Sequence, residues 1–124
     1  MNTVMLVGRL AQDIEVKTTE TGKEVTKVSL AVNRSFKNPD GIYEVDFIDC
    51  VLWDGLAKNI DEYCKKGDTV GIRGRIQVSH YEVEGVKKKS VDVIVERMSF
   101  LGSSRENFEE KQEKKNKKSK KGEQ

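Results

Sequence analysis

The chain has 124 residues, of which 35% are charged and 6% aromatic, and its formal net charge is +2. This length supports one domain with little left over, and no run approaches the ~20 apolar residues that a membrane-spanning helix needs. The opening MNTVMLVGRL has no basic segment ahead of its apolar one, which argues against a secretory signal.

The charge is unevenly distributed along the chain. Residues 105–124 hold eight Lys or Arg and five Asp or Glu, so the first 104 residues hold 15 basic and 16 acidic ones. The part of the chain expected to fold is therefore close to neutral. Any affinity for nucleic acid must come from local basic patches and from stacking, helped by a basic tail.

The first half of the chain predicts three strands. Residues 3–11 form a short apolar run, and the alternating segment IEVKT is followed by ETGK, where Gly22 can adopt the positive φ of a turn. Residues 24–36 alternate cleanly, and KNPDG at 37–41 is the strongest loop signal. The inward positions expected in the second strand are Thr26, Val28, Leu30 and Val32.

The third strand, EVDFIDCVLW at residues 44–53, carries apolar residues on both sides. Alternation sends Ile48, Cys50 and Leu52 to one side, which is enough to seal a core. The opposite side holds the only Trp of the chain, Trp53, together with Phe47. Large aromatic residues that face water are unfavourable unless a partner binds them.

Residues 54–67 change to a helical period. We expect Asp54 to cap the first turn, Lys65 and Lys66 to complement the helix dipole, and Gly67 to end the helix. The stripe at spacings i, i+4, i+7 and i+8 consists of Leu56, Ile60, Tyr63 and Cys64.

Two further strands follow the helix. Residues 68–83 form a long strand in which Gly71 and Gly74 suggest bends, and the EG pair turns the chain into the last strand at 90–101. The inward positions expected in the long strand are Val70, Ile72, Ile76 and Val78.

This order predicts an all-β fold, a five-stranded Greek-key barrel of the OB type with one short α-helix between strands 3 and 4. An SH3-like barrel or a small open sheet fits less well, because the helix falls between the third and fourth long strands. We expect the barrel domain to cover residues 1–102. Residues 103–124 have no apolar periodicity, which predicts a disordered Lys/Glu-rich tail.

The two cysteines, Cys50 and Cys64, belong to no CxxC or Cys–His cluster. Reduced cysteines of this kind act as small apolar residues in cytosolic proteins. A zinc site would need more ligands than two Cys and the distant His80 offer. We therefore expect a cytoplasmic protein without metal or cofactor, with a disulfide or a metal role as the alternative.

Four aromatic residues lie outside the core stripes, and each has a cation within a few positions. Interleaved aromatic and basic residues on one sheet surface form a platform for unpaired bases and their phosphates, each stacked base being worth ~1–3 kcal/mol. The alternative is structural: Trp53 could pack under the helix and Phe47 could fill a second small core. The four residues are Phe36, Phe47, Trp53 and Tyr81.

The chain resembles the bacterial single-stranded DNA-binding protein family over roughly residues 1–101. The motifs that carry the resemblance are LVGRL, LAVNR before an aromatic residue, the strand FIDCVLW, the helix end YCKKG, and GRI, and they occur in that order. The resemblance implies that Phe36, Phe47, Trp53 and Tyr81 stack on DNA. It also implies a homotetramer around which the strand wraps.

We therefore expect a nucleoid-associated, non-enzymatic protein that coats single-stranded DNA during replication, recombination and repair, without sequence preference and without catalytic residues. The ending KKNKKSKKGEQ offers no acidic tip of the kind through which relatives recruit replication and repair enzymes, which argues against that recruitment. A basic tail would instead attract phosphates. The cations expected to neutralise phosphates are Arg9, Arg34, Lys37, Lys58, Lys65, Lys66, Arg73 and Arg75.

Three other functions remain open from the sequence. One is an RNA-binding or primosome-type OB protein, and another is a module whose aromatic face binds a protein. The third is a metal-dependent nuclease on the barrel, built from carboxylates such as Asp13, Glu15, Asp46 and Asp49.

Overall fold

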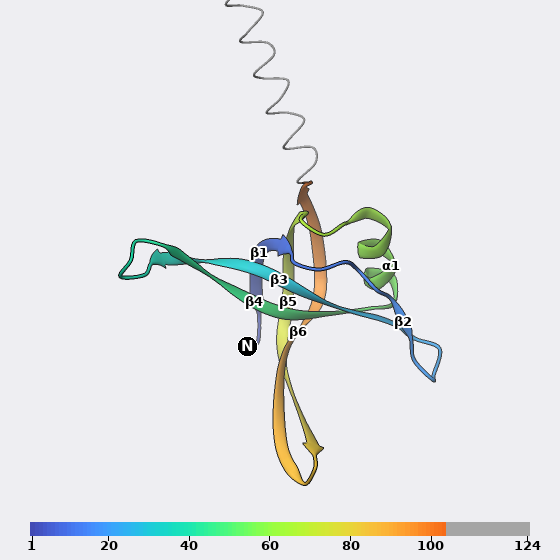
Figure 1. Ribbon diagram of the computed structural model, residues 1–124. Coiled ribbons are helices and arrows are strands. Elements are labelled where there is room, and N and C mark those ends of the chain that lie inside the picture. The colour runs from blue at the N-terminus through green and yellow to red at the C-terminus, as the bar shows by residue number, and fades with distance from the viewer. Residues whose placement is uncertain (104–124) are drawn as a thin grey trace, which may run out of the picture.

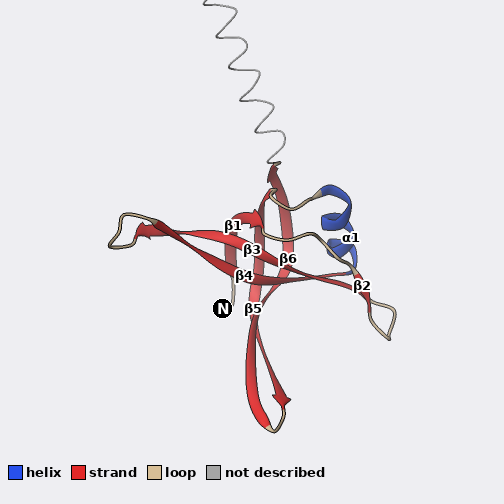
Figure 2. Ribbon diagram, in the orientation of Figure 1, coloured by secondary structure: helices blue, strands red, loops and turns tan. Residues whose placement is uncertain are grey.

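The computed structural model describes residues 1–103, which form a β-barrel with one helix at its side (Figures 1 and 2). Residues 104–124, which contain nearly all of the predicted disordered tail, lie outside the described residues. The helix α1 spans Asp54–Tyr63. The strands are β1 Val4–Leu10, β2 Lys17–Thr18, β3 Glu24–Lys37, β4 Tyr43–Trp53, β5 Thr69–Val83 and β6 Val86–Gly102.

The strands form one closed sheet in the order β1-β5-β6-β4-β3-β2, and an additional β1–β3 pairing closes the barrel. Only β4 and β6 pair in parallel; the other described pairs are antiparallel. The helix α1 lies between the third and fourth of the five long strands, as predicted. The predicted OB-type barrel is therefore confirmed.

The barrel interior is filled by the alternate residues of each strand. In β3 the buried residues are Thr26, Val28 and Leu30, and in β4 they are Cys50 and Leu52. The hydroxyl of Thr26 is satisfied because its Oγ1 donates to the carbonyl oxygen of Glu15 at 2.8 Å. Both cysteines are buried and unpaired. The other members of the core are Leu10, Ala57, Ile60, Cys64, Val70, Ile72, Val93 and Val95.

Two hairpins extend beyond the barrel in different directions (Figure 1). We call residues 34–44, at the β3–β4 turn, the β3–β4 arm, and residues 76–93, at the β5–β6 turn, the β5–β6 arm. The β5–β6 arm is paired from Ile76↔Val93 to Val83↔Val86. Its turn places Glu84 and Gly85 at positive φ, 52° and 78°.

The prediction that Ile76 and Val78 face the core is wrong, because β5 has left the barrel at these positions. Their side chains are 46% and 45% exposed, whereas Val70 and Ile72 earlier in the strand are buried as expected. The change occurs at a register shift between Arg73 and Gly74. The extra residue lies in β6, where Glu96 has no partner in β5, and a β-bulge of this kind bends the strand and increases the local twist.

The N-terminal segment supports the point where β5 leaves the barrel. The last β1–β5 pair is Val4↔Gly74. Beyond it, the Asn2 side chain continues the ladder, since its Nδ2 donates to the Ile76 carbonyl at 2.8 Å and its Oδ1 accepts from the Ile76 N–H at 2.9 Å. A side chain thus replaces one residue of a neighbouring strand.

The predicted start of the helix is correct, but the predicted cap is wrong. Trp53 occupies the N-cap position and makes no side-chain capping hydrogen bond. Asp54 has a positive φ of 50°, and its Oδ1 accepts from the Glu24 N–H at 3.3 Å, so it ties the helix start to β3.

The helix ends four residues before the predicted Gly67. Lys65 and Lys66 therefore lie beyond the last turn. Tyr63, expected in the apolar stripe, is 67% exposed, whereas Ile60 and Cys64 of that stripe are buried. Gly67 does adopt a positive φ, 93°, but in the following turn, where its N–H donates to the Leu10 carbonyl at 2.8 Å. Among the residues described, no helix is long and apolar enough to cross a membrane.

Candidate nucleic-acid interface

The outward side of β4 is aromatic and accessible. Phe47 is 66% exposed and Trp53 is 39% exposed, while Cys50 and Leu52 on the other side of the strand are fully buried. The alternative that Phe47 fills a second small core is therefore excluded, and Trp53, which the alternative packs under the helix, remains partly accessible. Their side of the strand faces outward from the barrel.

The same surface continues without interruption onto β5. Cross-strand partners lie on one face of a sheet, and a single row of partners runs from Lys27 through Val51 and Ile94 to Arg75. Alternation along β5 places Tyr81, which is 48% exposed, on the side of Arg75. We call this surface, with Phe47, Trp53 and Tyr81, the aromatic face.

Phe36 lies in the β3–β4 arm and is 83% exposed. Between the pairs Asn33↔Val45 and Lys37↔Tyr43, three residues of β3 are opposite Glu44 alone. Alternation therefore does not carry through this bulge, and the register leaves open which side of the arm Phe36 faces. Phe36 is therefore an exposed aromatic residue of the β3–β4 arm.

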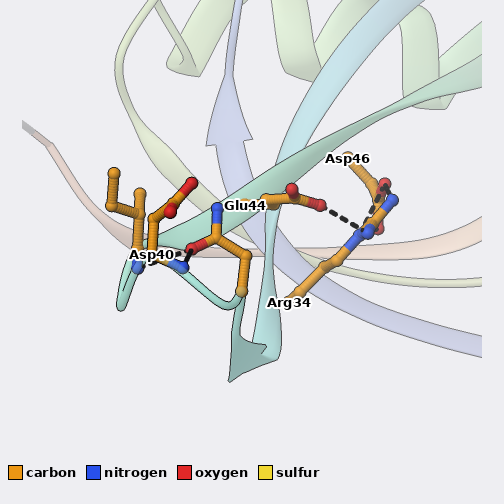
Figure 3. Close-up of polar contacts among 6 residues, drawn as sticks. Arg34, Asp40, Glu44 and Asp46 are labelled. Atoms are coloured by element: carbon orange, nitrogen blue, oxygen red, sulfur yellow. Dashed lines mark hydrogen bonds and ion pairs between the residues drawn. The ribbon is translucent and has the colours of Figure 1, made fainter.

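Arg34 is held by two carboxylates across the arm (Figure 3). Its Nη1 donates to Glu44 Oε2 at 2.6 Å, and its Nε and Nη2 donate to Asp46 at 3.0–3.2 Å. The hydrogen bond from Arg34 holds the pKa of Asp46 below its usual value. The side chain of Arg34 thus joins β3 to β4, and its predicted contact with a phosphate would require this cluster to open.

Six of the eight predicted cations, all except Arg34 and Lys58, are exposed and have no ion-pair partner within residues 1–103. Three of these six are arginines that lie in β1 and β5: Arg9, Arg73 and Arg75. Arg9 and Phe47 line the same surface hollow of about 630 Å³. Arg75 lies on the aromatic face itself, in the row that contains Val51.

The predicted lysines are more scattered. Lys58 on α1 approaches Glu24 Oε1 at 3.7 Å. Lys65 and Lys66 lie in the turn before β5, so the length of that strand, roughly 40 Å from Thr69 to Tyr81, separates them from Tyr81. Lys37 lies in the β3–β4 arm, where its Nζ is 5.5 Å from the centroid of the Tyr43 ring.

Two carboxylates near the centre of the aromatic face are balanced by a lysine that sequence reasoning missed. Lys27 Nζ is 3.3 Å from Asp92 Oδ1 and 3.9 Å from Asp49 Oδ2. The Asp92 side chain is only 14% exposed and its Oδ1 accepts no hydrogen bond, so this ion pair is its compensation. Strand alternation predicts that Asp49 lies on this face. It does not predict that Lys27 from β3 and Asp92 from β6 lie next to Asp49.

The carboxylates considered for a nuclease are not brought together. Asp46 points to the side of β4 opposite Asp49 and is bound to Arg34. Within residues 1–103, no group of three or more His, Cys, Asp or Glu side chains is arranged to hold a metal ion.

Taken together, these features define an OB-type barrel whose outer sheet face presents aromatic rings and unpaired cations. OB barrels use this region of the sheet to bind oligonucleotides or oligosaccharides. Comparison with known sequences narrows the class. The chain matches the model of the single-strand binding protein family over residues 1–101, and it belongs to that family.

Relatives agree with this assignment. The chain is 46% identical over 101 residues to single-stranded DNA-binding protein B of Bacillus subtilis, a match that covers 81% of this chain and 89% of the relative. It is 43% identical over 106 residues to single-stranded DNA-binding protein 3 of Listeria innocua and 44% identical over 104 residues to single-stranded DNA-binding protein 1 of Streptococcus agalactiae. These two matches cover 85% and 83% of this chain, but 66% and 64% of the relatives.

Proposed function

We propose that this protein binds single-stranded DNA without sequence preference and coats it during replication, recombination and repair. The observation that carries the proposal is the exposure of Phe47, Trp53 and Tyr81 on one sheet face, which runs from the barrel strand β4 onto the β5–β6 arm. Membership of the single-strand binding protein family and the names of the relatives support it. As part of this proposal, the protein works in the cytoplasm, in association with the nucleoid.

The mechanism is stacking assisted by charge. Every base has a flat π-face, so a ring such as Trp53 accepts any base and contributes ~1–3 kcal/mol per contact. Arg9, Arg73 and Arg75 are placed to neutralise phosphates, because no carboxylate among the described residues competes for them. Lys27 holds Asp49 and Asp92, and this reduces the repulsion that two uncompensated carboxylates would exert on a polyanion.

Assembly as a homotetramer is part of the proposal. From Val4 to Val7, β1 pairs only with β5, so its other edge is unpaired within residues 1–103. The adjoining outer surface is apolar in part: Met5 is 78% and Val7 60% exposed, and both line a hollow of about 400 Å³ together with Leu101 and the two arginines Arg73 and Arg97. An unpaired strand edge beside an apolar surface is suited to a second copy of the chain.

A fluorescence titration tests the function, because Trp53 is the only tryptophan. Oligo-dT should quench its emission, oligo-rU should do so more weakly, and duplex DNA should leave it nearly unchanged. With a dye-labelled oligo-dT read by anisotropy, Trp53→Ala should weaken binding by about 1–3 kcal/mol. Tyr63→Ala is the matched control, since Tyr63 is exposed on α1 and lies off the aromatic face.

Each of the other outcomes contradicts a part of the proposal. Equal quenching by oligo-rU would assign the face to RNA as much as to DNA. Indifference to all three nucleic acids would favour a protein partner for the aromatic face. An unchanged affinity in Trp53→Ala would remove stacking from the mechanism.

A further inference from the structure

Tyr43 is an exposed aromatic residue that the sequence analysis did not assign to nucleic-acid binding. Tyr43 is the first residue of β4, and by strand alternation it lies on the same outward side as Val45, Phe47, Val51 and Trp53. The residue is 53% exposed. Tyr43 thus continues the row of rings on β4 past Phe47, by roughly 13 Å at the rise of a strand.

A lysine accompanies the ring. Lys37 is the cross-strand partner of Tyr43, and its Nζ lies over the ring at 5.5 Å from the centroid, within cation–π range. Such a cation occupies one face of the ring only. With more than half of the residue exposed, the ring can accept a flat group on its remaining surface while the ammonium stays near a phosphate.

The same pairing of residues occurs in the other arm. Tyr81 of β5 has Lys88 of β6 as its direct cross-strand partner. Each arm that extends beyond the barrel therefore presents a tyrosine opposite a lysine, and one of the two tyrosines is already part of the aromatic face. This repetition favours a shared role over an incidental contact in the hairpin.

The backbone that carries Tyr43 is fixed before any ligand binds. In the turn, Asn38 Oδ1 accepts from the N–H groups of Asp40 and Ile42 at 3.0 and 2.9 Å, and Gly41 supplies a positive φ of 77°. Figure 3 shows this turn next to the cluster of Arg34, Glu44 and Asp46 that joins the two strands. A group held in place in this way loses little conformational freedom on binding.

We propose that Tyr43, supported by Lys37, is an additional base-stacking position that extends the DNA-binding surface into the β3–β4 arm. The proposal rests on the proposed function and names a further residue of the same surface. The competing explanation is that the Lys37–Tyr43 pair only stabilises the hairpin. In that case Tyr43 affects the stability of the arm, and its ring does not report on DNA.

A relocated tryptophan separates the two explanations. In the double variant Trp53→Phe/Tyr43→Trp, the only indole is the one introduced at position 43, and oligo-dT should quench it. Trp53→Phe/Tyr63→Trp is the matched control, and its emission should not change. Unchanged emission of the first variant, at an oligo-dT concentration where anisotropy shows that it is bound, would overturn the proposal.

Affinity gives a second, independent readout. Tyr43→Ala should weaken binding of a long oligo-dT about 5- to 150-fold, whereas Tyr43→Phe, which keeps the ring, should bind like the parent chain. Urea unfolding of each variant shows whether the fold is retained. If the parent chain binds oligo-dT and Trp53→Ala weakens binding while Tyr43→Ala does not, the proposed function stands and the role of Tyr43 fails.

Discussion

Substitution of Gly74 by alanine should destabilise the barrel at the point where the β5–β6 arm begins. Gly74 is buried at the register shift of β5, and a Cβ atom added there would lie 2.3 Å from the carbonyl oxygen of Ile94 and 3.1 Å from Val93 Cγ1. The first contact is with backbone, which cannot be relieved by a change of rotamer. Strands β5 and β6 must therefore move apart.

Overpacking of a core typically costs about 1–3 kcal/mol, and a clash with the backbone of a paired strand belongs in the upper half of that range. For a domain of this size each kcal/mol lowers Tm by about 4–8 °C. In urea, we expect a lower unfolding midpoint with an unchanged slope.

The matched control is Gly55→Ala, the same chemical change at an open position. Gly55 lies in the first turn of α1, and a Cβ atom added there meets nothing within 4 Å. We expect this variant to be neutral or to gain up to about 1 kcal/mol. A midpoint for Gly74→Ala equal to or above that of the parent chain would show that close approach of β6 does not require glycine there.

Four further predictions concern ionisation and the tail. Burial, with smaller effects of Asp49 and Asp92, raises the pKa of the Cys50 thiol to about 11. In a Cys64→Ser background, Ellman's reagent at pH 8 should therefore label Cys50 only after the protein is unfolded in urea. Rapid labelling of the folded protein would contradict this prediction. Because the folded state keeps a proton that the unfolded chain releases near pH 9, stability should also fall as pH rises from about 9 to 11. Because the pKa of Asp46 is lowered in the folded state, this carboxylate contributes stability above about pH 4, and the contribution is lost as pH falls through the pKa of the folded state. Arg34→Gln should raise the pKa of Asp46 in a carboxyl NMR titration. An unchanged pKa in this variant would show that Arg34 is not its cause. Deletion of residues 105–124, which carry a net +3, should reduce the salt dependence of DNA binding, and an identical slope would make the tail irrelevant to DNA.

The pattern of strands was predictable because each long strand keeps one face in the core. Alternation placed Val28 and Leu30 inward, and it placed Phe47 and Trp53 on the opposite side of β4. Alternation assigns each residue to one side of a strand, but that side is buried only as long as the strand stays in the barrel. Burial was wrongly predicted for Ile76 and Val78, because nothing in their own spacing shows that β5 has already passed the end of the barrel.

Interactions between side chains on different strands could not be predicted from the sequence. The ion pairs of Arg34 with Asp46, and of Lys27 with Asp92, depend on register and on which strands are neighbours. Arg34 therefore could not be distinguished from Arg75 as a phosphate contact before the structure was known. Tyr43 is different: it has the same parity as Phe47, so alternation alone would have found it if the strand had been started one residue earlier.

Within residues 1–103, the part of β6 from Val86 to Asp92 pairs only with β5, so its outer edge carries unpaired main-chain groups, and Lys87, Lys88 and Lys89 follow one another there. Two-stranded ribbons with unpaired edges are prone to join edge to edge. Three consecutive ammonium groups make that union costly, because a second ribbon brings the same charges to the seam. The lysines of this arm therefore make edge-to-edge pairing of two such ribbons less favourable.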